Sequence, residues 1–311
     1  MPDPTIHPRA PLDDRPADVL HLRPDRKGSV RLDPARAGWR YLSFESRLVS
    51  DAETTIEEAP GQETCVVVLG GRDVTIEAGA DRWQLEGRDS PFADLPSALW
   101  LPDGRELRVR IGSGPGSIAI ARAPRSERDG VASDPIVVRP ADVVVEIRGA
   151  GNATRQINHI VAPSFPADRL EVVEVLTPSG NWSSWPPHKH DVDDMPGEAV
   201  LEEIYHYRFA RPEAWALQRV YRGDRSRDGI WEVRDGDVVL VPDGYHPFTA
   251  AHGDDAYYLN ALAGDRRTMA CSFDPDLDWV RETWASMEPD PRVPLVRSVG
   301  SGLASGAAAR G

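Results

Sequence analysis

Three histidines and one glutamate in the second half of the chain have the types and spacing of a metal site. His188 and His190 are two residues apart in an extended segment, so both imidazoles should lie on one face of a strand. Glu203 follows on a second strand, and His246 ends a third apolar segment. Three imidazoles and one carboxylate suit zinc first, and also manganese, iron, nickel or cobalt. The pattern predicts that these four residues bind a divalent metal ion inside a catalytic β-barrel.

Glu202 is the rival of Glu203 as the acidic ligand, because neighbouring residues of a strand point to opposite faces. If Glu203 points inward, three aromatic side chains share its face. They are Tyr205, Tyr207 and Phe209. Aromatic residues suit the lining of a cavity, so we choose Glu203 as the ligand. His206 then becomes an outward, surface histidine.

A second set of polar residues could bind the carboxylate of a small substrate. Arg155 lies in a segment, residues 148–158, that is rich in glycine, arginine and amide side chains. Gln218 and Arg219 offer another amide and guanidinium on a predicted strand. A guanidinium can hold a carboxylate with two parallel hydrogen bonds, although most single arginines are solvated surface charges. We predict Arg155, Gln218 and Arg219 as substrate-binding residues.

The elements that position these residues are predicted to be short strands. The 311 residues include 28 prolines and 26 glycines, and 40% are hydrophobic, which favours a loop-rich β protein over a helical bundle. One short helix is expected at residues 278–287, where apolar side chains have helical spacing. Chain length suggests two domains. The predicted divisions are an N-terminal arm (1–28), a β domain without a metal site (29–124), a linker (125–135), a metal-binding β domain (136–290) and a disordered tail (291–311).

An internal repeat links the two predicted domains. Residues 98–106 and 238–246 each carry a short apolar strand followed by Pro-Asp-Gly, and Glu106 falls where His246 falls. Two related barrels, of which only the second keeps its metal, would explain the match. Pro-Asp-Gly is also common turn chemistry. Within the first barrel, residues 63–71 and 74–76 are expected to pair as a hairpin.

Charge and cysteine content exclude several classes of partner. The formal net charge of −14 argues against binding to nucleic acid or to an anionic membrane surface, but not against an anionic substrate. Two distant cysteines and the absence of an apolar leader or span predict a cytoplasmic protein. Exposed sheet edges favour a homo-oligomer.

His-x-His, a downstream glutamate and Gly-x5-Pro-x-Gly-x-His together resemble the signature of the cupin superfamily. The interval from His190 to Glu203 is longer than in that signature, and one residue rather than two separates Gly244 from His246. Longer blocks resemble the 5-deoxy-glucuronate isomerase family of myo-inositol catabolism, which is related to the 5-keto-4-deoxyuronate isomerases. They are residues 148–156, 181–191, 201–207, 218–221, 241–247 and 257–264.

This resemblance implies a bicupin, that is, an all-β protein with two cupin-like barrels in tandem. It implies a metal-dependent aldose–ketose isomerase that converts the sugar acid 5-deoxy-D-glucuronate into 2-deoxy-5-keto-D-gluconate, with the same four metal ligands. An enediol route needs a general base, for which Tyr207, Tyr245 and Glu203 are unranked candidates. A hydride shift would need none. The alternatives are a related uronate isomerase, a metal-dependent cupin dioxygenase or a non-catalytic sugar-acid-binding cupin.

Overall fold

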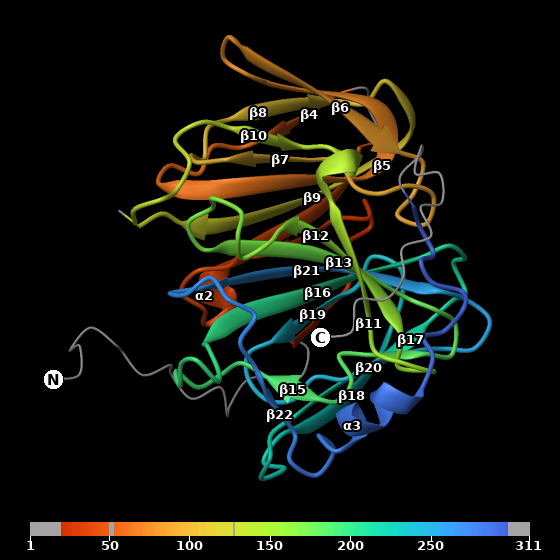
Figure 1. The fold of residues 1–311 in the computed structure, drawn as a ribbon. Coiled ribbons are helices and arrows are strands. Elements are labelled where there is room, and N and C mark those ends of the chain that lie inside the picture. The colour runs from red at the N-terminus through yellow and green to blue at the C-terminus, as the bar shows by residue number, and fades with distance from the viewer. Residues whose placement is uncertain (1–19, 50–52, 127, 298–311) are drawn as a thin grey trace, which may run out of the picture.

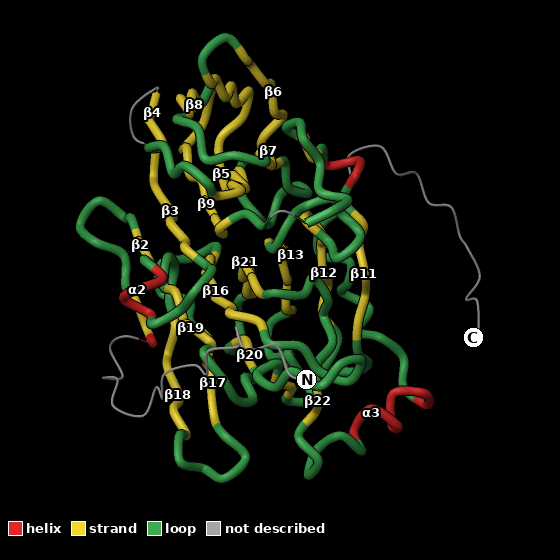
Figure 2. Tube along the Cα trace, turned by 90° about the vertical axis from the view of Figure 1, so that its left-hand side faces the viewer, coloured by secondary structure: helices red, strands yellow, loops and turns green. Residues whose placement is uncertain are grey.

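The structure is a computed structural model that describes residues 20–49, 53–126 and 128–297. Within these ranges nearly all elements are strands, arranged in two β domains stacked one over the other (Figure 1). The view turned by 90° shows the same division, with the short helix α3 at the far end of the second domain (Figure 2). The predicted all-β fold with few short helices is confirmed. No helix of the described ranges is long and apolar enough to cross a membrane.

The N-terminal domain is built on a nine-stranded sheet whose main path runs β10-β7-β5-β9-β3-β2. One face of this sheet encloses an aliphatic core, which includes Val66, Val68 and Ile120. The elements in chain order are β2 (Val30–Leu32), α2 (Pro34–Ala37), β3 (Ser43–Val49), β4 (Glu53–Ile56), β5 (Gln62–Ala78), β6 (Asp81–Arg88), β7 (Ala98–Leu101), β8 (Leu107–Arg110), β9 (Ser113–Pro124) and β10 (Ile136–Val138).

The predicted hairpin between residues 63–71 and 74–76 is wrong. Both segments belong to the single long strand β5, and its hairpin partner is β6. The Gly70-Gly71 pair produces two register shifts against β9, and Gly71 has a φ of 100°. The glycines therefore bend the strand through bulges and do not reverse it.

The C-terminal domain encloses its core between a seven-stranded sheet, ordered β1-β19-β16-β21-β13-β12-β11, and a four-stranded sheet, ordered β14-β20-β17-β18. A two-stranded ribbon of β15 and β22 completes it. The elements are β1 (His21–Leu22), η1 (Pro140–Asp142), β11 (Val144–Arg148), β12 (Arg155–Val161), β13 (Leu170–Thr177), β14 (Trp182–Ser183), β15 (His188–Lys189), β16 (Leu201–Phe209), β17 (Ala216–Tyr221), β18 (Asp228–Val233), β19 (Val238–Val241), β20 (Phe248–Ala250), β21 (Ala256–Gly264), β22 (Ser272–Phe273), α3 (Val280–Thr283) and η2 (Trp284–Ser286).

The two large sheets follow the same path through the chain. The order β7-β5-β9-β3-β2 in the first corresponds, strand by strand, to β19-β16-β21-β13-β12 in the second. The repeated Pro-Asp-Gly follows β7 in one domain and β19 in the other. This agreement supports the predicted internal repeat.

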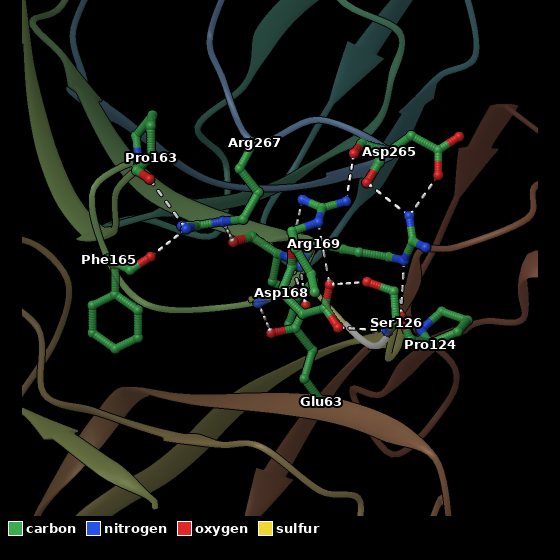
Figure 3. Close-up of polar contacts among 12 residues, drawn as sticks. Glu63, Pro124, Ser126, Pro163, Phe165, Asp168, Arg169, Asp265 and Arg267 are labelled. Carbon is green, nitrogen blue, oxygen red and sulfur yellow. Dashed lines mark hydrogen bonds and ion pairs between the residues drawn. The ribbon is translucent and has the colours of Figure 1, made fainter. Parts of the chain in front are cut away.

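Two equivalent glutamates join the domains reciprocally. Glu63, the second residue of β5, accepts hydrogen bonds from the backbone N–H groups of residues 168–170 at 3.0, 2.5 and 2.8 Å (Figure 3). Glu202, the second residue of β16, accepts them from residues 40–42 at 2.7, 2.9 and 2.9 Å. Each carboxylate thus fixes the start of a strand in the other domain, β13 and β3 respectively. Charge-assisted bonds of this kind are among the stronger ones in proteins.

The prediction that His206 is a surface histidine is wrong. His206 is 2% exposed, and its ring centroid lies 5.4 Å from that of Phe44 in the first domain. Burial lowers its pKa to about 3, so the ring is neutral. The outer face of β16 is the interface with the first domain, where one continuous hydrophobic core spans both sheets.

Short segments at the predicted boundaries pack onto the domains. Strand β1, from the predicted arm, pairs with β19 of the second domain, whereas β10 pairs with β7 of the first. In the predicted tail, Val296 is buried and its backbone exchanges hydrogen bonds with the side chain of Gln156 at 2.8 and 3.0 Å. The expected disorder therefore does not extend to residues 291–297. Residues 1–19 and 298–311 lie outside the described residues.

Candidate metal centre and active-site cavity

His190, Glu203 and His246 converge inside the second domain. One potential ligand atom from each lies within 4.8 Å of the other two, and all three residues are buried. Nε2 of His190 is 2.8 Å from Oε2 of Glu203, and Nε2 of His246 is 3.3 Å from the same oxygen. Glu203 comes from β16, His190 follows β15, and His246 lies between β19 and β20.

Backbone contacts orient both imidazoles for metal binding. Nδ1 of His190 is 3.1 Å from the carbonyl oxygen of Leu201, and Nδ1 of His246 is 3.0 Å from that of Gly244. Each Nδ1–H can donate to its carbonyl, which leaves Nε2 as the free lone pair. Nε2 of His246 is buried without a hydrogen-bond partner. An orphaned acceptor beside a carboxylate fits a divalent cation, so these residues form a possible metal site.

His188, the fourth predicted ligand, lies beside this group. Its ring centroid is 4.6 Å from that of His246 and 6.4 Å from that of His190. Its nitrogens are not part of the 4.8 Å group, although its side chain lines the same cavity. The structure thus brings three of the four predicted ligands together. The fourth, His188, lies beside them in the wall of the same cavity.

The electrostatic surroundings of the three histidines differ. Burial lowers the pKa of His246 to about 4 and holds that of His188 well below its ordinary value. Burial also disfavours the charged form of His190, but the Glu203 carboxylate outweighs it, and the pKa of His190 is raised. His188 and His246 are therefore neutral at pH 7, as metal ligands must be.

A cavity of about 360 Å³ opens beside the three converging residues and is lined by two of them, His190 and Glu203, and by His188. Its walls come from the seven-stranded sheet, from the β15–β22 ribbon and from the α3–η2 segment, which contributes Trp284. Apolar side chains such as Val173 alternate with polar ones, among them Ser184 and Asn260. The volume and mixed lining suit one small polar substrate.

The structure separates the two predicted arginines. Arg155 is buried, lines the cavity, and donates to the carbonyl oxygens of Ala153 and Trp185, both at 3.1 Å. Burial lowers its pKa to about 10. Within the described residues, no carboxylate lies at ion-pair distance from it. Arg219 instead forms two hydrogen bonds with Asp228, at 2.7 and 2.6 Å, and lines a separate apolar pocket.

Gln218 and Tyr207 do not line the cavity, but hydrogen bonds connect them to the backbone of His246. The Tyr207 hydroxyl donates to Oε1 of Gln218 at 2.9 Å, and Nε2 of Gln218 donates to the carbonyl oxygen of His246 at 2.8 Å. Tyr245 packs on Tyr221 with ring centroids 5.3 Å apart, also outside the cavity. Of the three residues predicted as bases, only Glu203 faces the substrate space.

Two tyrosines missing from the predicted site line the cavity instead. The hydroxyl of Tyr205 is 2.9 Å from Oγ of Ser184, and that of Tyr258 donates to Oγ of Ser183 at 2.9 Å. Burial raises the pKa of both phenols, so they stay protonated. Strand alternation from Glu203 signalled Tyr205. Arg148 and Tyr258 lie in segments that the sequence analysis singled out, 148–158 and 257–264, but neither was assigned to the site, and nothing in the sequence signalled Arg281 at the same cavity.

Comparisons with known proteins agree with this site. Residues 20–280 match the KduI/IolB family. A protein of Geobacillus kaustophilus named 5-deoxy-glucuronate isomerase is 42% identical over 264 residues, 84% of this chain and 93% of that protein. The crystal structure of an IolB-like protein from Salmonella typhimurium LT2 superimposes with a TM-score of 0.78 at 33% identity, covering 84% and 99% of the two chains. Oxalate decarboxylase from Lactobacillus farciminis shares only the fold, with a TM-score of 0.58 at 10% identity over 85% and 91%.

The relatives are named as isomerases, and the match covers nearly the whole length of each of them. This confirms that the chain is an isomerase and that the resemblance found in the sequence is real. With the match over residues 20–280, the chain belongs to the KduI/IolB family.

Proposed function

We propose that the protein is a metal-dependent aldose–ketose isomerase that converts 5-deoxy-D-glucuronate into 2-deoxy-5-keto-D-gluconate in myo-inositol catabolism. One observation carries the proposal: His190 and Glu203 of the buried His190–Glu203–His246 group line the same cavity as the buried guanidinium of Arg155, with which no carboxylate of the described residues forms an ion pair. A sugar acid has the two features that this cavity would recognise. Its carbonyl end suits a metal centre, and its carboxylate suits an arginine.

The residues of the cavity divide into three roles. His190, Glu203 and His246 would hold the cation, with His188 available beside them. When bound, a divalent ion, zinc being our first choice, polarises a carbonyl and acidifies a neighbouring hydroxyl. Arg155 would bind the carboxylate and thereby fix which end of the sugar faces the ligands. Tyr205 stays protonated and would donate a hydrogen bond to a substrate oxygen.

The test of the function is turnover of 5-deoxy-D-glucuronate followed by NMR in D2O. Metal-replete enzyme should produce the ketose, and enzyme treated with EDTA should not. Deuterium in the product would indicate proton transfer through an enediol, and its absence a hydride shift or a base shielded from solvent. Fully metal-loaded enzyme without turnover would contradict the isomerase proposal.

The arginine assignment gives a second expectation. Arg155→Met should raise KM about 10- to 100-fold, because a hydrogen bond to a charged group contributes about 1.5–3 kcal/mol. Steady-state kinetics and metal analysis together measure this, and metal content should stay unchanged. Arg219→Met is the matched control, since that guanidinium is already neutralised by Asp228. Equal KM values for both variants would remove Arg155 from substrate binding.

A further inference from the structure

Glu171 is a buried carboxyl group that the proposed chemistry does not use. It lies in β13 and is 0% exposed, and within the described residues neither of its carboxyl oxygens has a side-chain partner or a well-formed hydrogen bond, although the backbone N–H of Thr268 lies near enough to favour its ionised form. Leaving such a group buried and unpaired costs stability, so it calls for a compensating role. Burial raises its pKa to about 7, far above that of an ordinary glutamate.

Sheet register places Glu171 on the face that carries the metal centre. Leu262 of β21 lies directly opposite Glu171 on one side and opposite Glu203 on the other. Residues opposite one another in a sheet share a face, and Leu262 lines the cavity. Two strand spacings separate Glu171 from Glu203, about 10 Å between backbones. Val173, two residues further along β13, also lines the cavity.

The charged groups that act on Glu171 are Arg267, His190 and Glu203. Arg267 makes no ion pair with Glu171, because its guanidinium donates to the backbone carbonyl oxygens of residues 162, 163, 165 and 170 (Figure 3). His190 already faces Glu203. Within the described residues Glu171 therefore has no counter-ion in direct contact, and Arg267 and His190 favour its ionised form only from a longer distance. The metal centre lies on the same face of the sheet as Glu171, and a bound cation would add positive charge there.

We propose that Glu171 is the charge-compensating residue of the metal centre, protonated when the centre is empty and ionised when a divalent cation binds. The inference rests on the proposed metal binding. Glu203 alone leaves the occupied centre with a net charge of about +1, and a second carboxylate in the same interior neutralises it. The proton released by Glu171 goes to solvent. Coulomb attraction between a double charge and a carboxylate about 10 Å away, at an effective dielectric constant near 20, corresponds to roughly 100-fold in metal affinity.

The experiment compares wild type with Glu171→Gln, which keeps the shape and removes the charge. Zinc titration calorimetry in two buffers of different ionisation enthalpy counts the protons released, and competition with a chelator measures the affinity. Near pH 6 the variant should release about one proton fewer than wild type, and this difference should vanish above pH 8. At pH 8 its zinc affinity should be lower by about 10- to 100-fold.

Stability without metal separates this role from a merely structural one. A carboxyl with a raised pKa contributes stability below its unfolded-state pKa of about 4.3 and loses it as the pH rises to about 7. Metal-free Glu171→Gln should therefore have a higher Tm than wild type at pH 8 and a smaller gain in Tm on adding zinc. A structural role predicts a lower Tm in both states. Glu171→Leu should repeat the loss of zinc affinity.

Equal proton counts and equal affinities in wild type and Glu171→Gln would overturn the inference while leaving the metal site in place. Wild type that binds no zinc, manganese or iron would overturn the proposed metal dependence as well, so the two failures are distinguishable.

Discussion

Glu203→Gln should lose nearly all turnover while the protein keeps its fold. The carboxylate is the atom group shared by both imidazoles, at 2.8 and 3.3 Å, and a neutral amide replaces its charge with a weaker ligand. Loss of an outer residue that merely supports a ligand costs about 10- to 100-fold in metal affinity or activity, so loss of the ligand itself should cost more than about 100-fold. Metal analysis after dialysis and kcat at saturating substrate measure the effect.

The adjacent residue supplies the control for this variant. Glu202→Gln makes the same chemical change one position earlier, on the opposite face of β16, where the carboxylate binds the backbone of residues 40–42. We expect Glu202→Gln to lower the free energy of unfolding by about 1–3 kcal/mol and to retain its metal. Metal loss to the same extent in both variants would mean that Glu203 acts through strand geometry and not as a ligand.

Three of the four predicted metal ligands converge in the structure, and His188 lies beside them, because spacing strongly constrains such a group. Two histidines two residues apart and a glutamate on an aromatic strand face allow few arrangements, and the structure brings His190, Glu203 and His246 together. Arg219 could not be judged in the same way. Its partner, Asp228, lies on the adjacent strand β18, and the sequence of a strand does not reveal which charge neutralises it.

His206 shows a different limit. Alternation along β16 correctly gave its direction, away from Glu203, but direction does not say what covers a face. In a protein of one domain that face would meet water. Here it meets Phe44 and the sheet of the first domain. The error therefore came from treating the two domains as independent, since packing between them depends on surfaces that no local pattern encodes.

The repeat also shows which residues stand, in the described part of the first domain, at the positions of the candidate ligand Glu203 and its neighbour. Glu63 and Glu202 occupy equivalent positions, so the inward residues that follow, Thr64 and Val66, correspond to Glu203 and Tyr205. In the first domain the candidate ligand is thus replaced by the hydroxyl of Thr64, and the cavity-lining tyrosine by Val66 of an aliphatic core. What both domains retain is the outward glutamate that holds the partner domain. The first domain thus supports the candidate metal site by fixing the outer face of β16, the strand that carries Glu203.

That dependence predicts a large loss of stability from one buried ion pair between the domains. Arg88 of β6 and Glu174 of β13 are both 0% exposed and hydrogen-bonded to each other, and the Tyr257 hydroxyl donates to the same carboxylate at 2.8 Å. Glu174→Gln leaves the Arg88 charge buried without its counter-ion. Breaking a buried pair in this way costs about 3–5 kcal/mol. Unfolding in urea should show that decrease in the free energy of unfolding.

The double variant Arg88→Met with Glu174→Leu tests the cause. If the single variant is unstable because a charge is stranded, removing both charges should restore at least half of the lost free energy, since apolar pairs often replace buried ion pairs at little cost. If the pair is needed for its hydrogen bonds to Tyr257 and to the backbone of Val68, the double variant should be as unstable as Glu174→Gln. Zinc affinity measured on the folded double variant then reports whether loosening this contact reaches Glu203, 29 residues along the chain but only two strands away from β13.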